Sequence, residues 1–457
     1  MVRPDRITMI ATGENPAGPL KSEIGGGREA CAGLLAHVWT GTEHGPPSAV
    51  PTFIPRRSPM PPANPLLLAT DRPAIPLIQA WASRYGNEHG PILDMCQAAP
   101  GYEPCAELLD RLAEEAGNPA NARYGAILGD PLLREAYARH SSYALQGQIK
   151  ADQVAITAGC NQAFMLVTLA IAQRGDAILL PMPWYWNHKM TLDMLGVEAL
   201  PLPCAEAEGF VPDVAAARTL ISERVRALVL VTPNNPTGAV YPPATIAAFR
   251  DLCREHGIAL ILDETYRDFL PDGQERPHAL FSDPDWSDTL IGLYSFSKAY
   301  GIPGHRLGAV TASSALMEQF FKALDCLHVC PQRPAQAAMA ALISSLGDWQ
   351  AANRAAINRR GEALRSVFQE LPGWSVASQG AFCAFVRHPF SERSSAEAAE
   401  WLASRRGVLC LPGSAFGEAQ DAYLRFAFGG VEEAGILQMG KRLSEVPAAA
   451  RGGAGRR

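Results

Sequence analysis

The sequence predicts an α/β fold with a large domain, whose mostly parallel sheet is flanked by helices, and a smaller α/β domain built from both chain ends. Two sequence patterns and the length of the chain support this prediction. Short apolar runs alternate with amphipathic segments from about residue 150 to 330, which is the β-α-β rhythm of a parallel sheet covered on both faces. A second alternation of strand and helix follows between residues 382 and 443. The length of 457 residues is enough for two domains with substantial cores.

Apolar runs predict the strands of the large sheet, at Ala177–Leu180, Ala227–Val231, Ile258–Leu262 and Leu290–Tyr294. Helices are predicted among them, at Asn161–Gln173, Trp186–Leu195 and Pro243–His256. Leu307–Ala312 follows the preceding strand too soon for a helical crossover, so we expect it to enter the sheet antiparallel. A long helical stretch begins near residue 335. The second alternation then predicts strands and helices at Phe382–Val386, Ser395–Arg405, Tyr423–Phe428 and Glu432–Leu443.

The two ends of the chain differ from its middle. Residues 1–59 are rich in glycine and proline and show no sustained helical or strand period, so we expect a disordered extension. Met60 is an alternative start of translation. Residues 447–457 are expected to form a tail.

Composition argues against several classes of protein. A net charge of −6 and a pI near 6.0 give no reason to expect nucleic acid as a partner. No run of 18 or more apolar residues indicates a transmembrane helix, and the N-terminus lacks the apolar core of a secretory signal. The ten scattered cysteines indicate free thiols in a reducing compartment, so we expect a cytoplasmic protein. Cys326, His328 and Cys330 lack a second ligand pair, and no metal site is expected there.

The segment around Lys298 carries the strongest chemical signal. It reads Ser295-Phe296-Ser297-Lys298 and continues through glycines 301, 304 and 308, with Arg306 among them. Lysine forms a Schiff base with a carbonyl cofactor, and a set of serine, arginine and glycine suits a phosphate. A surface lysine on a glycine-rich loop is the ordinary alternative. We prefer the cofactor because three other segments point to the same one.

Polar groups also follow other predicted strands, where ligands bind in open α/β sheets. Asp263 ends one strand and could keep the pyridinium nitrogen of a cofactor protonated, although capping the next helix is an equally simple role. Asn235, in Asn234-Asn235-Pro236-Thr237-Gly238, belongs either to a plain turn or to a site where it faces a phenolate oxygen together with Tyr266.

Three further features fit the same chemistry. Gly159 and Asn161 stand between a short strand and a helix, whose N-terminus offers free N–H groups to a phosphate. Pro183-Trp184-Tyr185-Trp186 offers an aromatic face to a flat ring, with core packing as the alternative. Arg425 lies inside an apolar strand and therefore needs an anion, either an internal carboxylate or that of a substrate.

Together these segments resemble the class I/II aminotransferases of the fold-type I pyridoxal-phosphate-dependent family. The resemblance covers roughly residues 65–445 in a single order. Its main motifs are Asn235-Pro236-Thr237-Gly238, Asp263-Glu264-Thr265-Tyr266, the run from Ser295 to Gly308, and Arg425. It implies an enzyme that uses pyridoxal 5'-phosphate to move an amino group between an α-amino acid and a 2-oxo acid.

The resemblance also implies a role for each matched residue. Lys298 would bind the cofactor covalently and move the α-proton, while Asp263 would pair with the pyridine nitrogen and Tyr266 with the ring oxygen. The other cofactor-binding residues would be Tyr124, Gly159, Cys160, Asn161, Tyr185, Asn235, Ser295, Ser297 and Arg306. The substrate would meet Ala98, Asn235 and Arg425.

Further expectations follow from the resemblance. Tyr124 would reach the phosphate held by a partner subunit, so we expect a homodimer. Ala98 replaces a glycine that is usual in the loop over the substrate, and Cys160 stands where many relatives have a smaller residue. The chain would divide into an N-terminal arm with part of the small domain at 60–110, a large cofactor-binding domain at 111–340 and a small C-terminal domain at 341–446.

The sequence leaves the reaction and the substrate partly open. The alternative is a carbon–sulfur β-lyase or another enzyme of the same fold, but Arg425 would hold the carboxylate in place and so favours transamination. A ligand-sensing regulator would need a DNA-binding module, which residues 1–59 do not indicate. Tyr102, Trp184 and Trp186 favour a neutral or aromatic amino donor. Arg333 could bind a second carboxylate, but a solvated residue at a helix start is the simpler interpretation.

Overall fold

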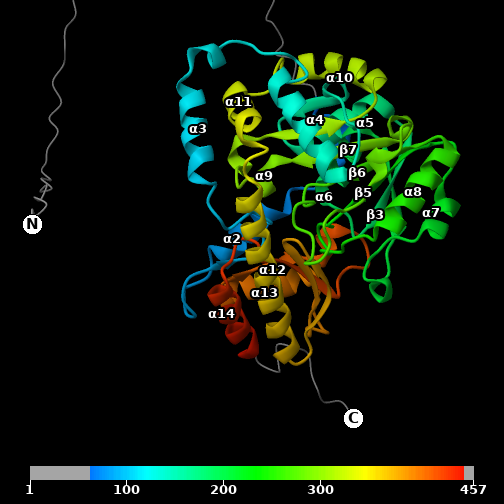
Figure 1. Ribbon diagram of the computed structural model, residues 1–457. Helices are drawn as coiled ribbons and strands as arrows, with labels where there is room; N and C mark the ends of the chain where they lie inside the picture. Colours follow the sequence, from blue (N-terminus) through cyan, green and yellow to red (C-terminus); the bar gives the residue numbers. More distant parts are fainter. Residues whose placement is uncertain (1–61, 447–457) are drawn as a thin grey trace, which may run out of the picture. The chain divides into compact units, whose positions relative to one another are not determined.

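The computed structural model describes residues 62–446 (Figure 1), so the expected extension at 1–59 and tail at 447–457 lie outside the described residues. The described part contains a seven-stranded sheet and a four-stranded sheet, which we call the large and the small sheet. The fold is mixed α/β with a mostly parallel central sheet flanked by helices. The fold class predicted from the sequence is therefore confirmed.

The large sheet has the strand order β2-β8-β7-β6-β5-β3-β4. Its strands are β2 (Val154–Thr157), β3 (Ala177–Met182), β4 (Glu198–Pro203), β5 (Val225–Val231), β6 (Ala259–Asp263), β7 (Leu290–Ser295) and β8 (Gly308–Thr311). The strand β8 pairs antiparallel with both of its neighbours, as expected from the short connection before it. The strand β4 was not predicted, because prolines at 201 and 203 weaken its signal; it lies at the edge of the sheet, where a missing N–H is tolerated.

Helices cover both faces of the large sheet, because side chains alternate along its strands. In β5, Leu228 and Leu230 belong to one core, whereas Ala227 and Val229 belong to another. The first core includes residues of α3 (Ala106–Gly117), α4 (Pro131–Leu145), α7 (Val214–Leu220), α8 (Pro243–His256) and α11 (Arg333–Leu342). The second includes residues of α5 (Cys160–Ile171), α6 (Trp186–Leu195) and α10 (Ser314–Leu327).

The small sheet is antiparallel, with the order β12-β13-β10-β9. Its strands are β9 (Ser375–Gly380), β10 (Cys383–Arg387), β12 (Leu411–Pro412) and β13 (Tyr423–Ala427). It shares a core with α12 (Gly347–Glu370), α13 (Ser395–Arg406) and α14 (Glu433–Ser444), which lie together in the lower half of Figure 1.

The first described segments join elements from the C-terminal part of the chain. The strand β1 (Leu93–Asp94) pairs in parallel with β11 (Val408–Leu409). The helix α2 (Ala74–Ala82) packs against α13, and α1 (Pro65–Ala69) packs against α6. None of the helices between residues 62 and 446 is both long and apolar enough to cross a membrane.

Candidate active site

Six strands of the large sheet, β2, β3, β4, β5, β6 and β7, point the same way, so their carboxyl ends meet at one edge. A cavity of about 590 Å³ opens at this edge. Most of the predicted site residues line it, and these are Ala98, Cys160, Asn161, Tyr185, Asn235, Asp263, Tyr266, Ser295, Ser297, Lys298, Arg306 and Arg425. The topology therefore brings together groups that are up to several hundred residues apart in the chain.

Lys298 lies on α9 (Phe296–Ala299), a single helical turn that follows β7 and is capped by the Ser295 hydroxyl. Its Nζ donates a hydrogen bond of 2.6 Å to the carbonyl oxygen of Ala98. Loss of solvation lowers the pKa of Lys298 from 10.5 to about 8, and the nearby cations Arg306 and Arg425 act in the same direction. A neutral amine is the form that can bond to a carbonyl carbon and accept a proton.

Asp263 ends β6 and is only 3% exposed. Its Oδ2 lies 3.1 Å from Nε2 of His188, and its Oδ1 accepts hydrogen bonds from the backbone N–H and the hydroxyl of Thr265, at 3.0 and 2.7 Å. Burial alone would raise the pKa of Asp263, but the bonds from His188 and Thr265 outweigh it and leave the pKa below its usual value. The carboxylate is thus held ionised at the floor of the cavity, as a partner for a protonated nitrogen requires.

His188 and Thr265 both hold the Asp263 carboxylate, and the sequence reasoning missed both. His188 is buried on α6, where its ring stacks on Phe164 with ring centroids 4.0 Å apart. A signal was available, since His188 follows Tyr185 by three residues and so lies on the same face of the helix. Thr265 follows Asp263 by two residues, a spacing typical of a local turn closed by an aspartate side chain.

Positive charge and free N–H groups meet where β2 joins α5. Gly159 precedes α5 with a φ of 90°, and a Cβ at this position would collide with Nη2 of Arg306. Arg306 donates from Nη2 to the carbonyl oxygen of Ala158 at 3.2 Å. With the hydroxyls of Ser295 and Ser297 beside it, this corner has the donors that a phosphate needs.

Cys160 stands at the first position of α5, beside Gly159. Burial raises the pKa of its thiol well above the usual value, so the side chain remains neutral. Its backbone N–H is therefore the part suited to an anion, and a cysteine here is compatible with the phosphate corner.

Arg425 is completely buried on β13. Its Nη1 donates to Oδ1 of Asn235 at 3.3 Å and its Nη2 donates to the carbonyl oxygen of Cys96. Its Nε has no hydrogen-bond partner, and no carboxylate within residues 62–446 forms an ion pair with it. The internal salt bridge considered from the sequence is therefore absent from the described chain, and the buried guanidinium at the cavity wall lacks an anionic partner there.

Among the aromatic residues, Tyr185 and Trp186 line the cavity. The hydroxyl of Tyr185 donates to Oδ1 of Asn161 at 3.4 Å, and Trp186 lies against the guanidinium of Arg425, 5.9 Å from ring centroid to Cζ. The sequence indicated that Tyr102 and Trp184 could also line the substrate site, but neither of them lines this cavity. Tyr102 instead donates its hydroxyl to the carbonyl oxygen of Lys298, and Trp184 lines a separate, small cavity beside His188.

Two predicted residues lie elsewhere in the chain. Tyr124 is 84% exposed and does not line the cavity. Arg333 begins α11 and donates to the carbonyl oxygen of Ala120, outside the cavity, as the simpler interpretation expected.

The fold and this edge of the sheet define a class of enzyme that holds a phosphorylated carbonyl cofactor beside a reactive lysine. A family model described as aminotransferase class I and II matches residues 90–443. The chain belongs to this family, whose members use pyridoxal phosphate, and it is an aminotransferase. The resemblance stated from the sequence is thereby confirmed.

Relatives that are named for different amino donors match the chain. An aromatic aminotransferase from Arabidopsis thaliana is 26% identical over 383 residues, which cover 82% of this chain and 94% of the relative. An arginine–pyruvate transaminase from Pseudomonas aeruginosa is 30% identical over 307 residues, covering 67% of this chain and 77% of the relative. The solved structure of a double mutant of Thermus thermophilus aspartate aminotransferase shares the fold, with a TM-score of 0.78, 24% identity, and coverage of 85% of this chain and 100% of that one.

Proposed function

We propose that the cavity at the carboxyl edge of the large sheet binds pyridoxal 5'-phosphate and an α-amino acid, and that Lys298, Asp263 and Arg425 are its principal residues. The observation that supports this most strongly is that a lysine with a lowered pKa, an ionised aspartate and an arginine with no carboxylate partner among residues 62–446 line one cavity. These groups fit the reactive carbonyl, the ring nitrogen and the substrate carboxylate respectively.

The residues around the cavity fit the rest of the cofactor. Ser295, Ser297, Arg306 and the N-terminus of α5 would hold the phosphate. Asn235 and Tyr266 would contact the ring oxygen, and Tyr185 would lie against the ring. Pyridoxal phosphate, when bound, supplies a carbonyl carbon for the amino group and a ring that withdraws electrons from the substrate Cα.

The protein's own residues would then control the proton and the orientation of the substrate. Arg425 would grip the α-carboxylate, so that the Cα–H bond rather than the carboxylate is presented to Lys298. Lys298 Nζ, with its lowered pKa, would take the proton from Cα and return it. His188 and Thr265 would keep the Asp263 carboxylate oriented towards the ring nitrogen.

We further propose a neutral or aromatic amino donor. Within the described chain, the charged residues that line the cavity are Asp263, Lys298, Arg306 and Arg425, and each already has a role. The wall that remains for a side chain is neutral, and it includes Ile75 and Trp186. The relatives above are named for donors of different kinds, so this proposal depends on the cavity wall.

A donor panel with 2-oxoglutarate and pyruvate as acceptors tests the donor class. Neutral and aromatic donors should have the higher kcat/KM, and replacing Trp186 by alanine should lower kcat/KM for aromatic donors most. Aspartate exceeding every neutral donor by tenfold, about 1.4 kcal/mol of transition-state preference, would contradict the proposal.

Covalent labelling tests the cofactor assignment. Borohydride treatment of the purified enzyme should leave a pyridoxyl group on the peptide that contains Lys298, detected by mass spectrometry. A Lys298→Ala variant should lack the label while it still binds the cofactor reversibly. The same adduct at the same stoichiometry in that variant would refute the assignment.

We also propose a cytoplasmic homodimer with the domain boundaries expected from the sequence. The high exposure of Tyr124 supports the homodimer, because a hydroxyl that serves a partner subunit must lie on the surface of its own subunit. Sedimentation analysis and the Tyr124→Phe variant described below test the dimer.

A further inference from the structure

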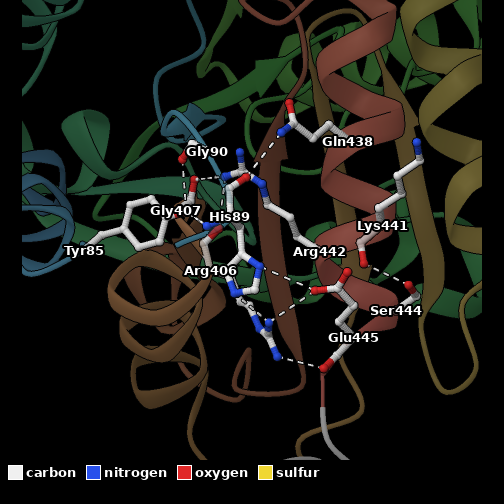
Figure 2. Close-up of polar contacts among 10 residues, drawn as sticks. All are labelled: Tyr85, His89, Gly90, Arg406, Gly407, Gln438, Lys441, Arg442, Ser444 and Glu445. Carbon is white, nitrogen blue, oxygen red and sulfur yellow. Dashed lines mark hydrogen bonds and ion pairs between the residues drawn. The ribbon is translucent and has the colours of Figure 1, made fainter. Parts of the chain in front are cut away.

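Polar side chains tie residues 85–91 to the ends of α13 and α14 (Figure 2). This segment lies between α2 and β1, and the chain on both sides of it lines the cavity. Ala74 and Ile75 lie before the segment, and Gln97 and Ala98 lie after it. Residues 85–91 therefore join two stretches that line the cavity.

Three successive carbonyl groups of the segment are bound by side chains. The His89 oxygen accepts from Nε2 of Gln438 at 3.3 Å, and the Gly90 oxygen accepts from the Tyr85 hydroxyl at 3.0 Å. The Pro91 oxygen accepts from Nη2 of Arg442 at 2.7 Å. Because the segment is neither helix nor strand, these side chains supply hydrogen bonds that regular structure would otherwise provide.

Arg442 connects this segment to the end of α13. Its Nη1 donates to the carbonyl oxygens of Arg406 and Gly407, at 3.0 and 3.1 Å, so that one guanidinium holds three carbonyl groups from two segments. Arg442 is 2% exposed and forms no ion pair with a carboxylate within residues 62–446, and its burial lowers the pKa of the guanidinium. Burying a cation without a carboxylate is unfavourable by itself. The three bonds from Arg442 to carbonyl groups therefore indicate that the protein needs these two segments held together.

Arg406 and His89 complete the attachment. Nη1 of Arg406 lies 2.8 Å from Nε2 of His89, and because arginine can only donate, Nε2 must accept. The imidazole proton then sits on Nδ1, which faces Oε2 of Glu445 at 3.4 Å. Nη2 of Arg406 donates to the carbonyl oxygen of Glu445 at 2.7 Å, so both ends of the contact are fixed (Figure 2).

Tyr85 fixes the segment sterically. Its hydroxyl accepts from the backbone N–H of His89 at 2.8 Å, and its ring covers Gly407. Gly407 has a φ of 60°, and a Cβ there would collide with the ring of Tyr85. The segment is thus held by hydrogen bonds and by close packing against the end of α13.

We propose that Arg442 is a positioning residue for the substrate wall of the cavity, and this rests on the function proposed above. Arg442 fixes Pro91 to the end of α13 and to α14, and thereby helps to fix the stretches at Ile75 and Ala98 that would contact the amino donor. Lys298 bonds the Ala98 carbonyl oxygen, but Asp263 is held by His188 and Thr265 and Arg306 by the Ala158 carbonyl oxygen, all outside this attachment. Loosening it should therefore weaken donor binding more than cofactor binding.

The test compares Arg442→Met with Arg442→Lys and with a matched control, all in the full-length enzyme loaded with pyridoxal phosphate. Arg359 provides the control, because it contacts Glu433 of α14 at 3.5 Å but does not contact residues 85–91. Arg442→Met should raise KM for the donor at least about fivefold, or ~1 kcal/mol, with kcat within about twofold and unchanged cofactor content. Arg442→Lys should restore part of the loss, and Arg359→Met should behave like the wild type.

A double-mutant cycle tests whether the effect passes through the cavity wall. Ile75→Ala should raise KM in the wild type but add little in the Arg442→Met background, because both changes disturb one contact. If Arg442→Met does not fold, Tyr85→Phe removes one of the three carbonyl bonds and should raise KM in the same direction. An unchanged KM, or additive effects of the two substitutions, would overturn the proposal.

A lower kcat, a higher KM and a lower cofactor content in parallel would indicate a general structural role for Arg442. That result would also overturn the proposal. The two proposals fail in distinguishable ways. If the wild type does not transfer amino groups, the proposed function fails. If it does and Arg442→Met binds the donor normally, only the positioning role fails.

Discussion

The lowered pKa of Lys298 has a consequence that can be measured without any substrate. With a pKa of about 8, about a quarter of the amine is neutral at pH 7.5, whereas a lysine with a pKa of 10.5 would be neutral in only about one molecule in a thousand. Lys298 should therefore react with an acylating reagent roughly 200 times faster than the higher pKa would allow. Burial is the largest cause of the shift, so removing the charge of Arg306 should raise the pKa of Lys298 only part of the way back.

Competitive acylation of the cofactor-free protein measures this directly. The labelled fraction of the Lys298 peptide, determined by mass spectrometry between pH 6 and 11, should rise with a midpoint near pH 8. Lys322, exposed on α10, serves as the reference for the reagent in the same digest. In Arg306→Met the midpoint should move to higher pH. A wild-type midpoint near 10.5, or a shift to lower pH in the variant, would refute the reasoning.

Three further variants test other contacts. His188→Ala should weaken pyridoxal phosphate binding about 10- to 100-fold in titrations of the cofactor-free protein, because it leaves the buried Asp263 without its histidine partner. The loss of affinity should deepen as pH falls and the Asp263 carboxylate protonates. His188→Gln keeps a hydrogen-bond donor and should lose less affinity. Arg425→Lys should raise KM for the donor about tenfold or more at unchanged cofactor content, because lysine cannot grip a carboxylate through two parallel bonds. Tyr124→Phe should speed cofactor dissociation about fivefold, the effect of one lost hydrogen bond, without changing the sedimenting mass; a fully active monomer would contradict the proposed dimer.

Sequence reasoning located the site because chain topology decides where strand ends lie. Lys298, Asp263 and Asn235 follow three different strands, and parallel pairing alone brings these ends to one edge of the sheet. Arg425 was singled out because a charge within an apolar strand needs an anion. In the structure, Arg425 has no carboxylate partner in the described chain. These inferences depend on chain direction and on charge, which can be read locally.

Features that depend on side-chain direction could not be predicted in the same way. Trp184 and Trp186 are separated by one residue, yet Trp186 faces the cavity and Trp184 lines a different space, because the chain turns into α6 between them. His188 was missed because its spacing from Tyr185 indicates a shared helix face but does not show which buried carboxylate the histidine bonds. The attachment around Arg442 was also beyond the sequence, since it joins backbone carbonyl groups whose positions depend on the tertiary fold.

A single-turnover experiment tests amino-group transfer most directly. The enzyme loaded with pyridoxal phosphate is mixed with an excess of a neutral amino donor and no 2-oxo acid acceptor, and the products are quantified. The site predicts one equivalent of 2-oxo acid per subunit, conversion of the cofactor to its amine form, no free ammonia, and recovery of the original cofactor when pyruvate is added. Continuous release of ammonia together with a 2-oxo acid, with the cofactor unchanged, would contradict transamination and identify a lyase.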